Sequence, residues 1–391
     1  MRLSLLAFLG IFTYATAANI TQQIITAAEL DGINLFSLAF ASEALASIEE
    51  LYNSAERFYN PTAILNGSRV DVHAHVVPPW YRAAVPFTAQ SPTPEWSIDR
   101  HLEFMANNSI RNSVLSISAP GSTVFPGSEE KSVALARLLN EYLAGVSFLP
   151  FSERTPIIPR VLTLNGLSSI TEAKYATRVL DAVGMGLLSN HEGYYLGNRS
   201  FTPFFQYLDK SLEGSRSIFV HPNAPCLYGG NGSLIDANPT PYSAGLVELY
   251  FETARTFMDL TISRTIANFT RLHWIVPHAG GAFPSIEDRF ITSQSADVIA
   301  LSKAAYSTRF WWDAAGPVFP HQVLGLLGYG VPSSQLLYGS GSDADWFPQD
   351  FPYAPPFSYS YEIAAIQNAS FLDPAEKRSL FEGNVEKALG P

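Results

Sequence analysis

Two histidines one residue apart, His73 and His75, follow a β-branched run that begins at Val70. Side chains at positions i and i+2 of a strand point to the same side, so both imidazoles can face one point in space. Imidazole nitrogens are common ligands of divalent metal ions in proteins. The spacing therefore predicts a metal site at the end of a strand.

Other metal-binding residue types follow later strand-like runs. They are His221, His278 and a late aspartate just past a strand. Polar groups at the ends of successive strands are typical of a site at the mouth of a parallel barrel. An ion held by imidazoles and one carboxylate keeps open positions for a substrate oxygen or a water molecule.

The elements that must position these residues alternate from Arg69 onward. Eight strand–helix alternations predict a parallel sheet, and eight units close a (β/α)8 TIM barrel. The expected strands are 69–73, 113–118, 156–163, 182–188, 217–221, 273–278, 308–313 and 335–340. The expected helices are 98–107, 129–144, 168–180, 201–212, 245–259, 284–289, 320–327 and 361–367.

The barrel domain is predicted over residues 67–391. Within it, 76–97 and 222–244 are rich in Pro or Gly and are expected to be long loops at the catalytic mouth. Residues 18–66 are rich in Ala, Leu and Glu and predict a helical N-terminal extension.

The N-terminus has the pattern of a signal peptide over residues 1–17. Arg2 precedes a short apolar run, and Ala15-Thr16-Ala17 offers a cleavage site. Secretion or entry into the secretory pathway, with N-glycosylation, is therefore expected. The Asn-x-Ser/Thr sequons lie at Asn19, Asn66, Asn107, Asn198, Asn231, Asn268 and Asn368.

The composition excludes some partners. The formal charge is −11 and Lys and Arg do not cluster, which excludes a nucleic-acid role. No apolar run is long enough to predict stable membrane insertion. Cys226 is the only cysteine, so no intrachain disulfide forms, and a buried structural thiol is favoured over a nucleophile. The histidines outside the constellation are expected to be structural: His101, His191, His273 and His321.

Five motifs in the barrel region support a family resemblance. They are Asp71-Val-His-Ala-His75 with Pro78-Pro79, Tyr195-Leu-Gly-Asn-Arg-Ser-Phe201, His221-Pro-Asn-Ala-Pro225, His278-Ala-Gly-Gly281 and Asp350-Phe-Pro-Tyr353. The chain resembles the amidohydrolase superfamily, in the branch of metal-dependent nonoxidative decarboxylases related to aminocarboxymuconate semialdehyde decarboxylase. Within that branch it looks closest to the fungal 6-methylsalicylate decarboxylase type.

The resemblance implies a role for each matching residue. His73, His75 and His221 match metal ligands, and His278 matches an acid/base or substrate-contacting group. Asp313 resembles an acidic position after the seventh strand, behind the ligands. The implied ion is zinc, with manganese as the alternative. The implied partners are a small aromatic carboxylate and a second copy of the chain, as a homodimer.

The eighth-strand aspartate departs from the family pattern, which reads Tyr-Gly-Ser-Asp-Phe-Pro-Tyr without a break. Here residues 341–349 separate Tyr338-Gly339-Ser340 from Asp350. A single insertion favours Asp350 as the metal ligand and as a catalytic acid. Asp343 is the rival, because Gly341-Ser342-Asp343 repeats the motif nearer the strand.

Three functions remain open at this stage. A decarboxylase would protonate the ring carbon of an aromatic acid and release CO2 and a phenol. A hydrolase would use the same site, with His278 as base, on an ester, lactone or amide. A noncatalytic barrel glycoprotein is the third alternative, since a fold does not fix a function.

Overall fold

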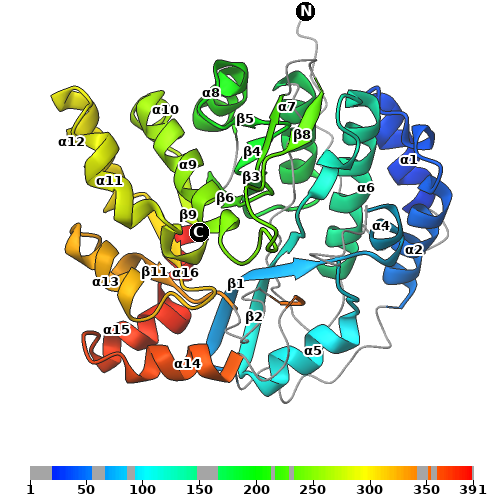
Figure 1. Ribbon diagram of the computed structural model, residues 1–391. Helices are drawn as coiled ribbons and strands as arrows, with labels where there is room; N and C mark the ends of the chain where they lie inside the picture. The colour runs from blue at the N-terminus through cyan, green and yellow to red at the C-terminus, as the bar shows by residue number, and fades with distance from the viewer. Residues whose placement is uncertain are drawn as a thin grey trace, which may run out of the picture.

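The computed structural model describes residues 20–54, 67–85, 93–147, 166–212, 216–228, 233–340, 351–353 and 359–389. Its centre is a set of parallel strands surrounded by helices (Figure 1). The strands of this centre are β1 (Arg69–Val76), β2 (Ile110–Ile117), β3 (Met185–Leu188), β6 (Ser217–His221), β9 (His273–Val276), β10 (Phe310–Asp313) and β11 (Leu336–Leu337).

The strand order is that of a parallel barrel. β1 pairs with β2, and a five-stranded parallel sheet runs in the order β11-β10-β9-β6-β3. The backbone N–H of Val72 on β1 donates to the carbonyl of Tyr338, next to β11, at 3.0 Å, which joins the two groups. This arrangement confirms the predicted barrel architecture. The expected strand 156–163 lies outside the described residues.

Helices cover the outside of the strands, as the alternation predicts. Those after β1 are α4 (Pro79–Ala84), α5 (Ile98–Asn107), α6 (Glu129–Ser147), α7 (Gly166–Arg178), α8 (Thr202–Lys210), α9 (Glu248–Ile262), α10 (Thr265–Asn268), α11 (Phe283–Ile291), α12 (Ala296–Tyr306), α13 (His321–Gly328), α14 (Tyr359–Asn368), α15 (Pro374–Arg378) and α16 (Val385–Leu389). Short turns of other helix types are η2 (Leu35–Ser37), η3 (Gly121–Val124), η4 (Arg199–Phe201), η5 (His278–Gly280), η6 (Ser333–Gln335) and η7 (Ser379–Gly383).

Two predicted loops contain regular structure. Helix α4 lies within 76–97, and the antiparallel hairpin of β7 (Cys226–Tyr228) and β8 (Leu234–Asp236) lies within 222–244. A second small hairpin, β4 (Asn190–His191) with β5 (Tyr194–Tyr195), follows β3. Sequence patterning missed these elements because each is too short to show a period.

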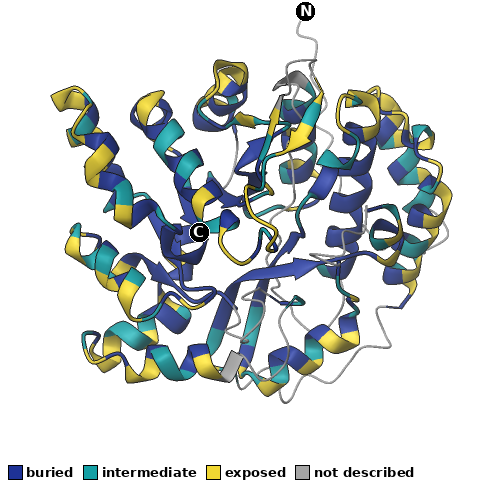
Figure 2. Cartoon of the chain, in the orientation of Figure 1, coloured by how far each residue is buried: buried dark blue, intermediate teal, exposed yellow. Residues whose placement is uncertain are grey.

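The N-terminal segment packs outside the barrel. Its helix α2 (Ala41–Asn53) lies beside α6, and α1 (Ile20–Leu30) packs against α2 (Figure 1). Helix α6 is buried on all its faces from Ser132 to Val146 (Figure 2). The fully buried guanidinium of Arg137 on α6 contacts Asp31 at 2.7 Å and Glu172 at 2.9 Å. This ion-pair network and the apolar contacts fix the segment against the barrel wall. No helix of the described residues is both long and apolar enough to cross a membrane.

The interior of the barrel is built in two layers. The lower layer is apolar and is closed from below by Val385 and Ala388 of α16. Its strand residues are Val70, Val72, Val114, Phe219, Ile275, Trp311 and Leu337. The next inward-facing position on a strand lies two residues further on and forms the upper layer. There His221 follows Phe219 on β6, and Asp313 follows Trp311 on β10.

A bulge in β1 changes which of its side chains face the barrel axis. Asp71 pairs with Ser113 and Ala74 pairs with Leu115, so three steps on β1 match two steps on β2. Val72 in the lower layer and His73 in the upper layer can therefore both face inward. Bulges commonly redirect a side chain next to a functional site in this way.

Candidate metal centre and catalytic site

Three histidines predicted from the sequence meet at the barrel mouth. His73, His75 and His221 are at most 5% exposed, and each offers one ring nitrogen within 4.8 Å of the other two. A zinc–nitrogen bond is about 2.0–2.1 Å long, so nitrogens bound to one ion lie closer than about 4.2 Å. The cluster therefore has nearly the spacing of a three-histidine metal site.

Hydrogen bonds fix the orientation of two of these rings. Nδ1 of His73 lies 2.9 Å from Oδ2 of Asp313, and Nδ1 of His221 lies 2.7 Å from the carbonyl oxygen of Pro222. A carboxylate and a carbonyl can only accept, so both Nδ1 atoms carry hydrogen and both neutral rings have their lone pair on Nε2. Nδ1 of His75 contacts Ser116 at 3.2 Å. The donor set fits a divalent ion.

Asp313 connects the metal cluster to His278. Its Oδ2 accepts from His73, while its Oδ1 accepts from the backbone N–H of His278 at 2.8 Å and of Ala315 at 3.1 Å. The side chain is completely buried. One carboxylate thus orients the ring of His73 and the backbone of His278.

Asp71, the first residue of the Asp-x-His-x-His motif, holds the bulged strand in place. Its Oδ1 accepts from the backbone N–H of His73 at 2.9 Å and of Ser340 at 2.8 Å. Burial raises the pKa of this carboxyl group, and the hydrogen bonds oppose the rise. Gly339 precedes Ser340 in the chain and leaves room for His73, because a Cβ atom on Gly339 would lie 2.8 Å from the Cβ of His73.

His278 lies against the metal cluster without belonging to it. Its ring centroid is 5.0 Å from that of His73 and 6.2 Å from that of His221. On another side, the ring of Tyr250 stacks on it with centroids 5.3 Å apart. This position suits a proton donor or acceptor that acts on a molecule bound at the cluster.

The last part of the Asp-Phe-Pro-Tyr motif lies beside His75. The carbonyl of Phe351 accepts a hydrogen bond from the backbone N–H of His75 at 3.0 Å, and the hydroxyl of Tyr353 bonds to Ser118. Phe351 also stacks on Phe104 with centroids 4.2 Å apart. Both predicted aspartates, Asp343 and Asp350, lie outside the described residues.

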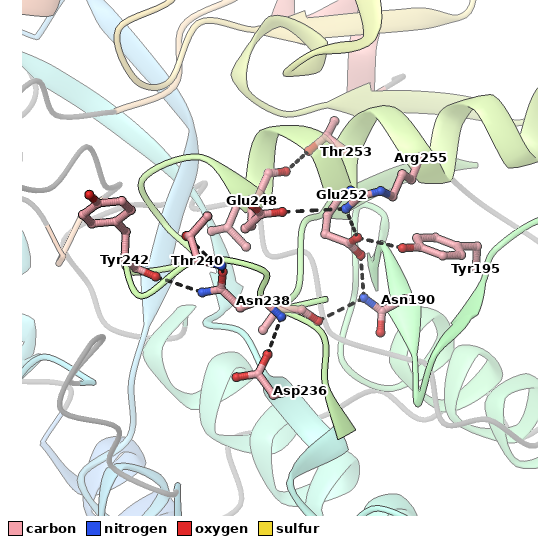
Figure 3. A network of polar contacts seen from close by, with 12 residues as sticks. Asn190, Tyr195, Asp236, Asn238, Thr240, Tyr242, Glu248, Glu252, Thr253 and Arg255 are labelled. Atoms are coloured by element: carbon pink, nitrogen blue, oxygen red, sulfur yellow. Dashed lines mark hydrogen bonds and ion pairs between the residues drawn. The ribbon is translucent and has the colours of Figure 1, made fainter. Parts of the chain in front are cut away.

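A buried network supports the loop that follows His221. Glu252 on α9 is completely buried and accepts from Asn190 at 2.8 Å, Tyr195 at 2.7 Å and Arg255 at 2.8 Å (Figure 3). Asn190 in turn donates to the carbonyl of Ala224 at 3.2 Å. The Tyr195 motif is thus explained by a structural role in anchoring this loop.

The other sequence candidates within the described residues do not belong to the three-histidine cluster. Cys226 is half-buried, donates to Asn190 at 3.1 Å, and burial raises its thiol pKa to about 11, which does not suit a nucleophile. His101 is buried on α5 and His191 on β4, while His273 begins β9 and His321 begins α13.

Sequence reasoning missed several residues that contact the site. Ser116 and Ser118 belong to the alternation Ser116-Ile117-Ser118 at the end of β2, a signal that was present in the sequence. Tyr250 and Gln322 reach His278 from helices, where no spacing rule marks them.

Comparisons with known proteins identify relatives of this chain. The chain matches the amidohydrolase family over residues 70–390. It is 29% identical to decarboxylase yanB of Aspergillus niger over 82% of this chain and 86% of that protein. It is 26% identical to 6-methylsalicylic acid decarboxylase of Penicillium expansum over 79% of this chain and 90% of that protein.

A crystal structure of 5-carboxyvanillate decarboxylase from Novosphingobium aromaticivorans, complexed with manganese and 4-hydroxy-3-methoxy-5-nitrobenzoic acid, has a similar fold. The TM-score is 0.65 at 16% identity, covering 84% of this chain and 97% of that one. At this identity the similarity concerns the fold.

Proposed function

The chain belongs to the amidohydrolase family, and we propose that it is a nonoxidative decarboxylase of a small aromatic carboxylic acid such as 6-methylsalicylate. The resemblance stated from the motifs is confirmed by the family match, and the named relatives bear out an enzyme of the decarboxylase class. The observation that carries the proposal is the buried cluster of His73, His75 and His221 with His278 against it.

A divalent ion is expected at the cluster, zinc or manganese. When bound, it supplies positive charge that orients the carboxylate and phenol oxygens of the substrate and stabilises negative charge. The manganese in the 5-carboxyvanillate decarboxylase structure supports a similar ion here. His73, His75 and His221 would hold it, and we propose Asp350 as the carboxylate ligand. The position of its chain neighbour Phe351, hydrogen-bonded to His75, favours Asp350 over Asp343.

The reaction requires a proton on the ring carbon that carries the carboxylate. A protonated His278 or Asp350 would give its proton to this carbon. The bond from the ring to the carboxyl carbon would then break, its electron pair would restore the aromatic ring, and CO2 would leave. Positioned acid catalysis contributes on the order of a hundred- to ten-thousandfold. The products are CO2 and a phenol.

Product analysis tests the proposal. Metal-reloaded protein is incubated with 6-methylsalicylate and a panel of hydroxybenzoates, and CO2 and phenol are both measured. We expect equal amounts of the two and no product after chelation. An acid formed without gas from esters, lactones or amides would instead show a hydrolase. No turnover by metal-loaded protein on either panel would favour the noncatalytic alternative.

We also propose that the protein enters the secretory pathway. The leader pattern supports this, and the sequon asparagines within the described residues, Asn107, Asn198, Asn268 and Asn368, are all exposed. Glycan release followed by mass spectrometry of the protein from its host tests the proposal, and unmodified asparagines at all seven sequons would contradict it. The homodimer expected from the resemblance stays a prediction, which light scattering tests.

A further inference from the structure

The turn that carries His278 has an unfavourable backbone conformation. Four consecutive residues have positive φ: 53° at His278, 48° at Ala279, 85° at Gly280 and 58° at Gly281. Left-handed backbone is unfavourable for a non-glycine residue, because its Cβ crowds the following carbonyl oxygen. Such a turn persists only where surrounding contacts hold it, so those contacts determine where the imidazole points.

One side chain from a distant helix holds both ends of this turn. Nε2 of Gln322, on α13, donates to the carbonyl of His278 and, at 2.8 Å, to the carbonyl of Gly281. These bonds are separate from the one that the N–H of His278 makes with Asp313. Gln322 therefore joins the two ends of this turn.

Tyr250 holds the imidazole and the turn together. Its ring stacks on the ring of His278 at an interplanar angle of 21°. Its carbonyl accepts from the backbone N–H of Ala282 at 3.1 Å. A side chain at Gly281 would collide with this same carbonyl, so the turn and the start of α9 fit closely.

We propose that Gln322 and Tyr250 are positioning residues that hold the His278 imidazole in the orientation needed for proton transfer. The inference rests on the acid/base role of His278 in the proposed function. Neither residue is among the predicted metal ligands. Loss of either contact should let the turn relax toward ordinary φ values and move the imidazole. A displacement of about 1 Å can cost on the order of a hundredfold in rate.

The test compares four variants as metal-loaded protein. Gln322→Leu removes the donor at similar size, and Tyr250→Leu removes the stacked ring. Tyr250→Phe keeps the ring, and Gln294→Leu makes the same change on a glutamine outside the site. We expect kcat to fall about 10- to 100-fold for the first two, with KM within about twofold. Metal content should stay at one ion per chain, and Tyr250→Phe should retain most of wild-type kcat.

A double mutant separates positioning from general damage. In a His278→Asn background, Gln322→Leu should cause no further loss of kcat, because its effect acts through the imidazole. An equal loss in both backgrounds would overturn the proposal, as would wild-type kcat in Gln322→Leu. Loss of bound metal would also overturn it, since the residue would then support the ligands.

A spectroscopic measurement keeps this inference separate from the proposed reaction. The imidazole carbon–proton NMR signal of His278 is identified by its absence in His278→Asn. It should shift or broaden in Gln322→Leu and stay in place in Gln294→Leu. An unchanged signal would refute the positioning role even if the protein decarboxylates no substrate. If the signal changes but the protein has no decarboxylase activity, the positioning role stands. The missing activity then refutes only the proposed function.

Discussion

His101 should make the folded protein sensitive to acid. It lies on the inner face of α5 with Ile98, Phe104 and Met105, and it is 4% exposed. Within the described part of the chain neither ring nitrogen has a hydrogen-bond partner. Burial without a compensating charge disfavours the imidazolium and lowers the pKa of His101 from 6.5 to about 3.

The sign and size of the effect follow from linkage. Between the two pKa values the unfolded chain binds a proton that the folded chain excludes, so stability is lost as the pH falls below about 6.5. From pH 7 to pH 4.5 this one group should lower the free energy of unfolding by about 2.5 kcal/mol. Buried Glu141 and Glu287 act in the opposite direction, because burial raises each pKa to about 7.

The assay isolates His101 by comparing two differences. Urea unfolding at pH 7 and pH 4.5 gives the pH-dependent loss of stability for the wild type and for His101→Phe. We expect the loss to be about 2.5 kcal/mol smaller in the variant. Contributions that do not involve His101 are common to both proteins and cancel.

An exposed histidine provides the control. His321→Phe, at the exposed start of α13, makes the same substitution outside the core and controls for the change of residue itself. An equal loss in the wild type and in His101→Phe would refute the reasoning, because it would mean that the buried ring titrates as it does in the unfolded chain.

The remaining predictions concern the metal centre. His73→Ala should lose the ion, and stoichiometric metal by mass spectrometry in that variant would refute the ligand assignment. His278→Asn should keep the metal and lose most turnover, and wild-type CO2 release would contradict the acid/base role. Of Asp343→Asn and Asp350→Asn, only the second should strip the metal on dialysis, and the reverse result would make Asp343 the ligand. Asp313→Asn should weaken metal affinity about 10- to 100-fold, and an unchanged affinity in competitive titration would show that Asp313 does not orient His73.

The sequence predicted the parts of the site that depend on local periodicity. His73 and His75 are two positions apart on a strand, so their side chains point to the same side. His221 and His278 end strand-like runs, and the ends of parallel strands lie at one end of a barrel. The eight strand–helix alternations predicted the barrel, because strand and helix patterns can also be recognised in short stretches of sequence. These features depend on short stretches of chain and on the common direction of parallel strands.

Other features depended on residues far apart in the sequence. Val72 and His73 are adjacent, and only the bulge against β2 explains how both can face inward. Asp313 was placed behind the ligands by resemblance. Its contact with His73, 240 positions away, and its second contact with His278 follow from the order and register of the strands.

The sequence by itself determined which side chains are available for chemistry: imidazoles at strand ends and late aspartates. Tertiary structure alone decided how the imidazoles are held. Gln322 and Tyr250 reach His278 from two helices, and Asp313 fixes the hydrogen on Nδ1 of His73. The physical reason is that hydrogen bonds and ring stacking act over a few ångströms, and only closure of the barrel brings these distant segments within that range.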